Sequence, residues 1–132
     1  MSLPIVITPI FIGLFVIVQV PLTLIVGMRR VQTGIRFFGG DDDVLLRRMR
    51  AHGNYTETVP IALLAMGCAE VLGMPSAALW VGGGFLAAGR IAHATEILRS
   101  GWGPGRSGGM VLTFLAMLEF GAWSLWRSLF QI

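Results

Sequence analysis

Four polar side chains recur at helical spacing at the start of a strongly apolar segment. The stretch "RRMRAHGNYTETVPIALLAMG", residues 47–67, carries Arg47, Arg50, Asn54 and Glu57 at intervals of three, four and three residues. On an α-helix with 3.6 residues per turn, this spacing predicts one continuous stripe of side chains. Two cations, one amide and one carboxylate in such a stripe can either pair with one another or bind a charged ligand.

Further polar groups interrupt the later apolar segments. Arg90 and His93 are one helical turn apart, and Glu119 falls near the middle of the last apolar segment. A charge at the centre of a membrane helix costs about 2.5–3.5 kcal/mol on insertion scales, so such groups face partners or a water-filled cavity. We interpret Glu119 as a protonated or paired contact between helices.

The balance of charge in this region favours a bound anion. Glu57 can neutralise one arginine. Four arginines fall near the same end of the predicted helices, namely Arg47, Arg50, Arg90 and Arg106. The surplus positive charge would suit a ligand carboxylate or thiolate. A purely structural alternative stays open, in which Glu57 pairs with Arg90 or Arg50 while Asn54 bridges two helices.

Composition indicates which elements position these residues. The chain has 132 residues, of which 55% are hydrophobic and 13% charged, and its mean hydropathy is +0.75. Soluble domains are about 25% charged, and a helix needs roughly 20 apolar residues to cross a bilayer. We therefore expect an all-α integral membrane protein with one domain, 1–132, folded as a bundle of four transmembrane helices. The expected spans are about 3–28, 44–72, 76–98 and 107–130.

The basic residues predict the orientation of this multi-pass bundle. All ten are arginines, and only Arg127 falls at the end of the bundle that holds both termini. By the positive-inside rule, the first and third loops are cytoplasmic and the termini non-cytoplasmic, in the inner membrane if the source is bacterial. Because the arginines lie at membrane boundaries, no nucleic-acid partner is expected. His52 and His93 lack further ligands at metal-binding spacing, so no metal is expected either.

Two local features predict details of the helices. The run Asp41–Asp43 precedes a helical pattern, so one aspartate is expected to cap the exposed amides of the second helix. The third span is rich in small residues, notably Gly82, Gly83, Gly84 and Gly89. Small residues on membrane helices allow close helix–helix approach.

Three motifs in this sequence resemble those of a known family. The segments "RAHGNYTETVP" (50–60), "GRIAHATEIL" (89–98) and "GRSGG" (105–109) are similar to the MAPEG family, membrane-associated proteins in eicosanoid and glutathione metabolism. The nearest branches are the microsomal glutathione transferases and the prostaglandin E synthases. The resemblance covers essentially the whole chain. It implies a homotrimer that binds glutathione at each subunit interface, near the cytoplasmic side.

Carried over by position, the resemblance also implies roles for individual residues. Arg106, at the start of the fourth span, would face the glutathione sulfur and act in catalysis. Arg50, Asn54 and Glu57 would hold the backbone and charged ends of glutathione. The full set of glutathione-binding positions is Arg50, His52, Asn54, Glu57, Arg90, His93 and Ser107.

The physical chemistry of glutathione agrees with those roles. A thiol with a pKa of ~8.5 is only a few per cent thiolate at neutral pH. Lowering that pKa by about two units requires about 2.7 kcal/mol. One arginine about 4 Å away supplies roughly 4 kcal/mol at an effective dielectric constant of ~20. A single residue such as Arg106 is therefore sufficient in principle to hold the thiolate.

The sequence departs from the family pattern in two places. Several members have a tyrosine one turn beyond the position of His93, whereas this chain has Ile97, so one contact to glutathione is missing. The first loop is shorter than in the prostaglandin-forming branch, and prostaglandin isomerisation is not expected. The function predicted is glutathione conjugation to a small lipophilic electrophile, or glutathione-dependent reduction of lipid hydroperoxides. The alternative is a non-catalytic membrane protein that binds lipid or serves as a scaffold.

Overall fold

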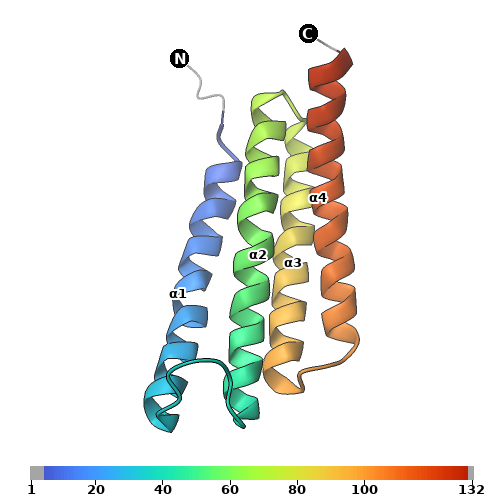
Figure 1. Ribbon diagram of the computed structural model, residues 1–132. Helices are drawn as coiled ribbons and strands as arrows, with labels where there is room; N and C mark the ends of the chain where they lie inside the picture. The colour runs from blue at the N-terminus through green and yellow to red at the C-terminus, as the bar shows by residue number, and fades with distance from the viewer. Residues whose placement is uncertain (1–4, 131–132) are drawn as a thin grey trace.

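The computed structural model describes residues 5–130, which form four antiparallel helices. These are α1 (Thr8–Thr33), α2 (Asp43–Val71), α3 (Ser76–Arg99) and α4 (Pro104–Phe130). Neighbouring helices run in opposite directions, so the start of α1 and the end of α4 lie at the same end of the bundle (Figure 1). The all-α prediction is confirmed.

The predicted spans correspond to these helices with shifted ends. The first two residues of the predicted span 3–28 lie outside the described residues. The helix there continues to Thr33, where Gly34 adopts a left-handed φ of 72° and donates its N–H to the carbonyl of Arg30. Glycine adopts this conformation without a steric penalty, so it ends the helix. The fourth helix begins earlier than predicted, at Pro104, because the fixed φ of proline suits the first turn of a helix.

Aspartate capping of α2 is confirmed, and Asp42 is the residue responsible. Its side chain accepts a hydrogen bond from the N–H of Leu45 at 2.6 Å, and it forms a 2.7 Å ion pair with Arg29 near the end of α1. The hydrogen bond from Arg29, followed by that from the Leu45 N–H, lowers the pKa of the Asp42 carboxyl below its ordinary value. One side chain thereby joins the cap of α2 to the end of α1.

Close packing of α3 against α4 depends on glycine, as predicted. A Cβ atom on Gly89 would lie 2.6 Å from the carbonyl oxygen of Gly109, and one on Gly82 would lie 2.6 Å from the ring of Phe120. Gly84, in contrast, faces open space.

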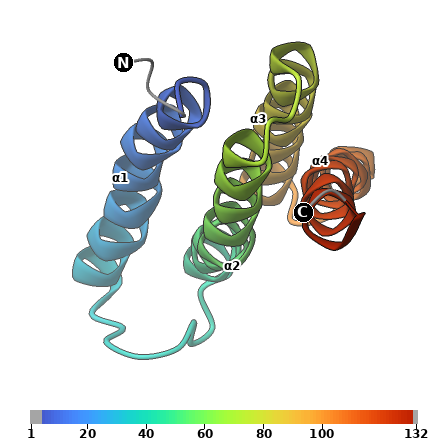
Figure 2. The same ribbon diagram turned by 90° about the horizontal axis from the view of Figure 1, so that it is seen from above.

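Seen from above, α1 lies beside α2 and away from α4 (Figure 2). The fold is therefore a three-helix unit of α2, α3 and α4, with α1 packed along α2.

The first turn of α1 is capped by a residue from the far end of α2. No side chain within α1 caps it. Instead, Glu70 accepts hydrogen bonds from the backbone N–H groups of Val6, Ile7 and Thr8, each at 2.7 Å. A carboxylate at a helix N-terminus also complements the helix dipole. Glu70 therefore ties α1 to α2 at the end opposite to the Asp42–Arg29 pair.

Two helices, α1 and α4, are long and apolar enough to cross a membrane by length and composition. Much of their surface is exposed and apolar: Ile17 is 70% exposed and Leu118 is 69% exposed. The polar stripe of α2 and the polar end of α3 reduce the mean hydropathy of these two helices. The four-span prediction is thus supported in part, by α1 and α4.

Candidate functional site

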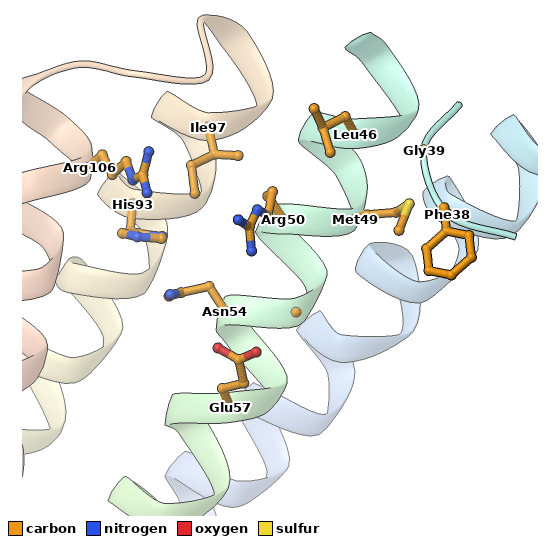
Figure 3. Close-up of a pocket in the computed structure, with 11 residues that line it drawn as sticks. Phe38, Gly39, Leu46, Met49, Arg50, Asn54, Glu57, His93, Ile97 and Arg106 are labelled. Carbon is orange, nitrogen blue, oxygen red and sulfur yellow. The ribbon is translucent and has the colours of Figure 1, made fainter. Parts of the chain in front are cut away.

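A cavity of about 480 Å³ opens between α2, α3 and the start of α4, at the end of the bundle that holds most of the arginines (Figure 3). The loop between α1 and α2 covers part of it. Its lining residues are Phe38, Gly39, Leu46, Met49, Arg50, Gly53, Asn54, Glu57, His93, Ile97 and Arg106. Five of the eight predicted site residues are among them.

One wall of the cavity is the polar stripe of α2. Arg50, Asn54 and Glu57 follow one another along the same face of this helix (Figure 3). Arg50 and Glu57 are exposed and Asn54 is half-buried, so their polar groups reach the cavity rather than the packed interior of the bundle. The helical spacing in the sequence predicted this stripe correctly.

The opposite wall comes from α3 and α4. His93 and Ile97 lie one turn apart on α3 and are 3% and 4% exposed, respectively. Ile97 lines the cavity at the position where the resemblance expects a tyrosine. An apolar side chain there supplies no hydrogen bond to a ligand. Arg106, from the first turn of α4, completes this wall beside His93 (Figure 3).

Arg106 is held by an aromatic ring rather than by an acid. Its guanidinium lies 4.5 Å from the centre of the Trp102 ring, a cation–π arrangement, and makes a long 3.5 Å hydrogen bond to the carbonyl oxygen of Gly101. Among residues 5–130, no carboxylate lies within ion-pair distance of Arg106. Its positive charge therefore acts on the cavity without a neutralising partner among the described residues.

Arg90 lies one layer behind the cavity instead of lining it. This residue is 3% exposed. Its Nη1 donates to Asn54 Oδ1 at 2.6 Å and to Thr58 Oγ1 at 3.0 Å, and its Nε donates to Thr113 Oγ1 at 2.9 Å. A guanidinium can only donate, so its contact with Asn54 must engage the amide oxygen. The NH₂ group of Asn54 is consequently left to donate toward the cavity.

The structure does not contain the ion pair considered for Glu57. Arg29 and Asp42 form the one salt bridge among the described residues. Arg90 takes the side-chain amide of Asn54 as its partner instead of Glu57. The structural alternative, in which Glu57 pairs with Arg90 or Arg50, is therefore not found among the described residues, because Arg90 is turned toward Asn54, Thr58 and Thr113. Glu57 remains available to a cationic group in the cavity.

Besides Arg90, two further predicted site residues, His52 and Ser107, do not line the cavity. The Nε2 atom of His52 lies 3.1 Å from the side-chain nitrogen of Gln19 and 3.2 Å from the hydroxyl of Thr23, both on α1. His52 therefore faces α1. Ser107 is exposed at the start of α4 and does not line the cavity.

Sequence reasoning missed the apolar side of the cavity. Leu46 and Gly53 continue the helical spacing of the stripe, so their positions were open to prediction. Phe38 and Gly39 belong to the loop, and no periodic signal marks them. They reach the cavity because Arg30 donates to three loop carbonyls, those of Ile35, Arg36 and Phe38, and so folds the loop back.

Comparison with models of known protein families identifies the family of this chain. The model of the MAPEG family matches residues 8–126, a range that includes every residue lining the cavity. The chain belongs to the MAPEG family. MAPEG proteins are membrane-associated, and they include glutathione-dependent transferases and isomerases. No curated protein and no solved structure matches this MAPEG chain significantly.

Within residues 5–130, no group of three or more His, Cys, Asp or Glu side chains is arranged to hold a metal ion.

Proposed function

We propose that this MAPEG chain is a glutathione-dependent membrane transferase. It would conjugate glutathione to small lipophilic electrophiles or use glutathione to reduce lipid hydroperoxides. The observation that carries the proposal is the charge pattern of one cavity. Two arginines, Arg50 and Arg106, line it with a single carboxylate, Glu57, and the amide of Asn54.

These groups match the groups of glutathione. At neutral pH, the tripeptide has two carboxylates, one ammonium group and a thiol. Arg50 provides a planar pair of donors for a carboxylate, and Glu57 accepts from the ammonium group. The NH₂ group of Asn54, turned toward the cavity by Arg90, adds a donor for a peptide carbonyl or carboxylate. Arg90 therefore contributes to binding through Asn54 in this proposal.

Arg106 is the proposed catalytic residue. It has no acidic partner in the described subunit, and its stacking on Trp102 leaves most of its N–H donors unused. Placed about 4 Å from the sulfur, it would stabilise a thiolate by roughly 4 kcal/mol at an effective dielectric constant of ~20. In conjugation, the thiolate sulfur forms a bond to the electrophilic carbon, and the leaving group departs with its electron pair.

Hydroperoxide reduction would use the same thiolate. The sulfur attacks the terminal oxygen of the hydroperoxide and the O–O bond breaks. The alkoxide leaves with the bonding electron pair and takes a proton from water to become the alcohol. Glutathione is oxidised to a sulfenic acid, which a second glutathione converts to the disulfide and water. Both reactions need the sulfur to meet an apolar molecule, and Phe38, Leu46, Met49 and Ile97 give the cavity an apolar side.

Assembly and membrane topology are part of the proposal. Arg50 and Glu57 are both exposed on the open side of the cavity. Charged groups that face lipid are costly, whereas a second copy of the chain against this face would enclose them. We therefore propose a homotrimer of four-span subunits in the membrane, with glutathione between subunits. The arginine-rich end would be cytoplasmic.

A titration with glutathione tests the proposal directly. The detergent-solubilised protein is titrated at neutral pH while the ultraviolet absorbance of the thiolate is followed. Saturable absorbance is the expected result. Binding without thiolate would support the alternative of a non-catalytic lipid-binding or scaffold protein. Absence of binding at millimolar glutathione would overturn the proposed function.

A further inference from the structure

The carboxylate of Glu96 lies against the loop that joins α3 to α4. Its Oε1 accepts a hydrogen bond from the hydroxyl of Ser100 at 2.6 Å, and its Oε2 accepts one from the backbone N–H of Gly105 at 3.2 Å. Gly105 is in the first turn of α4, where backbone N–H groups have no partner within their own helix. Glu96, a residue of α3, therefore caps α4. It does not line the cavity.

Two glycines allow the carboxylate to come this close. A Cβ atom on Gly103 would lie 2.5 Å from the carboxyl carbon of Glu96, and one on Gly105 would lie 2.7 Å from its Oε2. Neither glycine has a positive φ, so backbone conformation does not require glycine at these positions. A side chain at either position would instead displace the Glu96 carboxylate.

The segment that Glu96 holds is the one that orients Arg106. The backbone N–H of Arg106 donates to the carbonyl of Gly103 at 3.1 Å, and its guanidinium stacks on Trp102 at 4.5 Å. Trp102 is itself 74% exposed, so few packing contacts fix its ring. Its carbonyl oxygen, however, lies 2.9 Å from the Ser100 hydroxyl, whose single proton is shared between this oxygen and Oε1 of Glu96.

We propose that Glu96 is a positioning residue for Arg106. Its carboxylate fixes Ser100 on one side and Gly105 on the other. The segment between them carries the ring of Trp102, and Arg106, which stacks on that ring, directly follows Gly105. This inference rests on the proposed function, since it explains how the arginine assigned to the thiolate is aimed at the cavity. Glu96 acts through Arg106 and does not touch the ligand.

Glu96→Ala and Glu96→Gln form the matched pair that tests the role. Glutamine retains an oxygen for the Gly105 N–H and an amide for Ser100, whereas alanine retains neither. We expect Glu96→Ala to bind glutathione within about threefold of the wild type while its thiolate fraction falls about tenfold. We expect Glu96→Gln to keep most of the thiolate. Wild-type thiolate formation in a folded Glu96→Ala variant would overturn the proposal.

A double-variant cycle separates positioning from a general loss of stability. If Glu96 acts through Arg106, adding Glu96→Ala to Arg106→Ala lowers the thiolate fraction no further. If the two losses multiply, Glu96 acts on the site by another route and the proposal is wrong.

Gly103→Ala probes the same contact without altering Glu96. The added methyl collides with the carboxylate, so we expect a loss of thiolate similar to that in Glu96→Ala. The collision disappears once the carboxylate is removed, so Gly103→Ala should cause no additional loss in the Glu96→Ala background. An additional loss there would contradict the inferred contact.

A measurement without glutathione keeps this inference distinguishable from the proposed function. The NMR signal of the Trp102 indole N–H, assigned with Trp102→Phe, reports the stacking of Arg106 on the ring. Glu96→Ala should shift it in the same direction as Arg106→Ala does, whether or not glutathione binds. An unchanged signal in Glu96→Ala would overturn the positioning role, even in a protein that binds glutathione as proposed.

Discussion

Arg90 donates to the side-chain oxygen of Asn54 over 2.6 Å, so a buried cation on α3 sets the direction of an amide on α2. The guanidinium is 3% exposed, and no carboxylate in residues 5–130 neutralises it. This contact joins the stripe of α2 to the interior of the bundle. It also means that Arg90 and Asn54 act as one unit.

Asn54→Asp tests that unit. A carboxylate at this position would form an ion pair with Arg90, and we expect the free energy of unfolding to rise by about 1 kcal/mol. Glutathione affinity should fall about tenfold or more, because aspartate has no N–H to donate to the cavity. Thermal unfolding and calorimetric titration measure the two effects. Asn54→Ala is the control, and there both stability and affinity should fall. A stable Asn54→Asp variant with unchanged affinity would show that the amide does not reach the ligand.

Arg106→Ala tests the proposed catalytic residue. We expect an intact fold and assembly, because the side chain makes one cation–π contact and one long hydrogen bond. The pKa of bound glutathione should rise by about two units, which lowers the thiolate fraction up to about a hundredfold at neutral pH. A pH titration of thiolate absorbance measures this shift. The matched control is Arg99→Ala, since Arg99 is exposed and does not line the cavity. Turnover at the wild-type rate in Arg106→Ala would remove this residue from the mechanism.

Glu57→Ala distinguishes a ligand contact from a structural ion pair. Glu57 has no salt-bridge partner among the described residues, so we expect the free energy of unfolding to change by no more than about 0.5 kcal/mol. Glutathione affinity should fall because the ammonium group loses its acceptor. A large loss of stability in the same variant would instead indicate that Glu57 pairs with a neighbouring subunit. Melting curves at several protein concentrations would then detect that pairing.

Glu70→Ala should loosen the start of α1. The substitution leaves the N–H groups of Val6, Ile7 and Thr8 without the acceptor that caps them. Loss of a helix cap costs about 0.5–2 kcal/mol, and we expect a decrease in unfolding free energy within that range. Hydrogen exchange should speed up at these three amides while the amides of α4 remain protected. Equal exchange in wild type and variant would show that the cap does not form in solution.

Because of the Arg29–Asp42 ion pair, we expect the stability of the protein to decrease at low pH. The pKa of Asp42 is lowered in the folded protein, so its contribution is fully present above the ordinary aspartate pKa of about 3.9. The contribution is lost as the pH falls through the lower, folded-state pKa. Melting temperatures measured from about pH 6 down to about pH 2 should show this loss in the wild type. The Asp42→Asn variant cannot form the ion pair, so its melting temperature should decrease less than that of the wild type over the same pH range. Parallel curves for the two proteins would contradict the role of the pair.

The features that were predicted correctly from the sequence depend only on residues that are close together in the chain. Helical periodicity places Arg50, Asn54 and Glu57 on one face wherever that helix lies, and an aspartate just before a helix finds free backbone N–H groups. These outcomes need no knowledge of the other helices. The glycines of α3 differ, because Gly89 lies against α4 whereas Gly84 faces open space, so the sequence indicates only where close approach is possible.

Tertiary structure decided which way each polar group turned. The rotation of α2 against α1 directs His52 to Gln19 and Thr23, and the packing of α3 against α4 directs Arg90 to Thr113 and Asn54. The loop residues Phe38 and Gly39 enter the cavity only through the contacts of Arg30. Spacing in a sequence sets angles around one helix axis, whereas a contact between two helices also depends on their relative rotation and height. Those two quantities are set by the summed packing of all the side chains between the helices, so no single motif contains them.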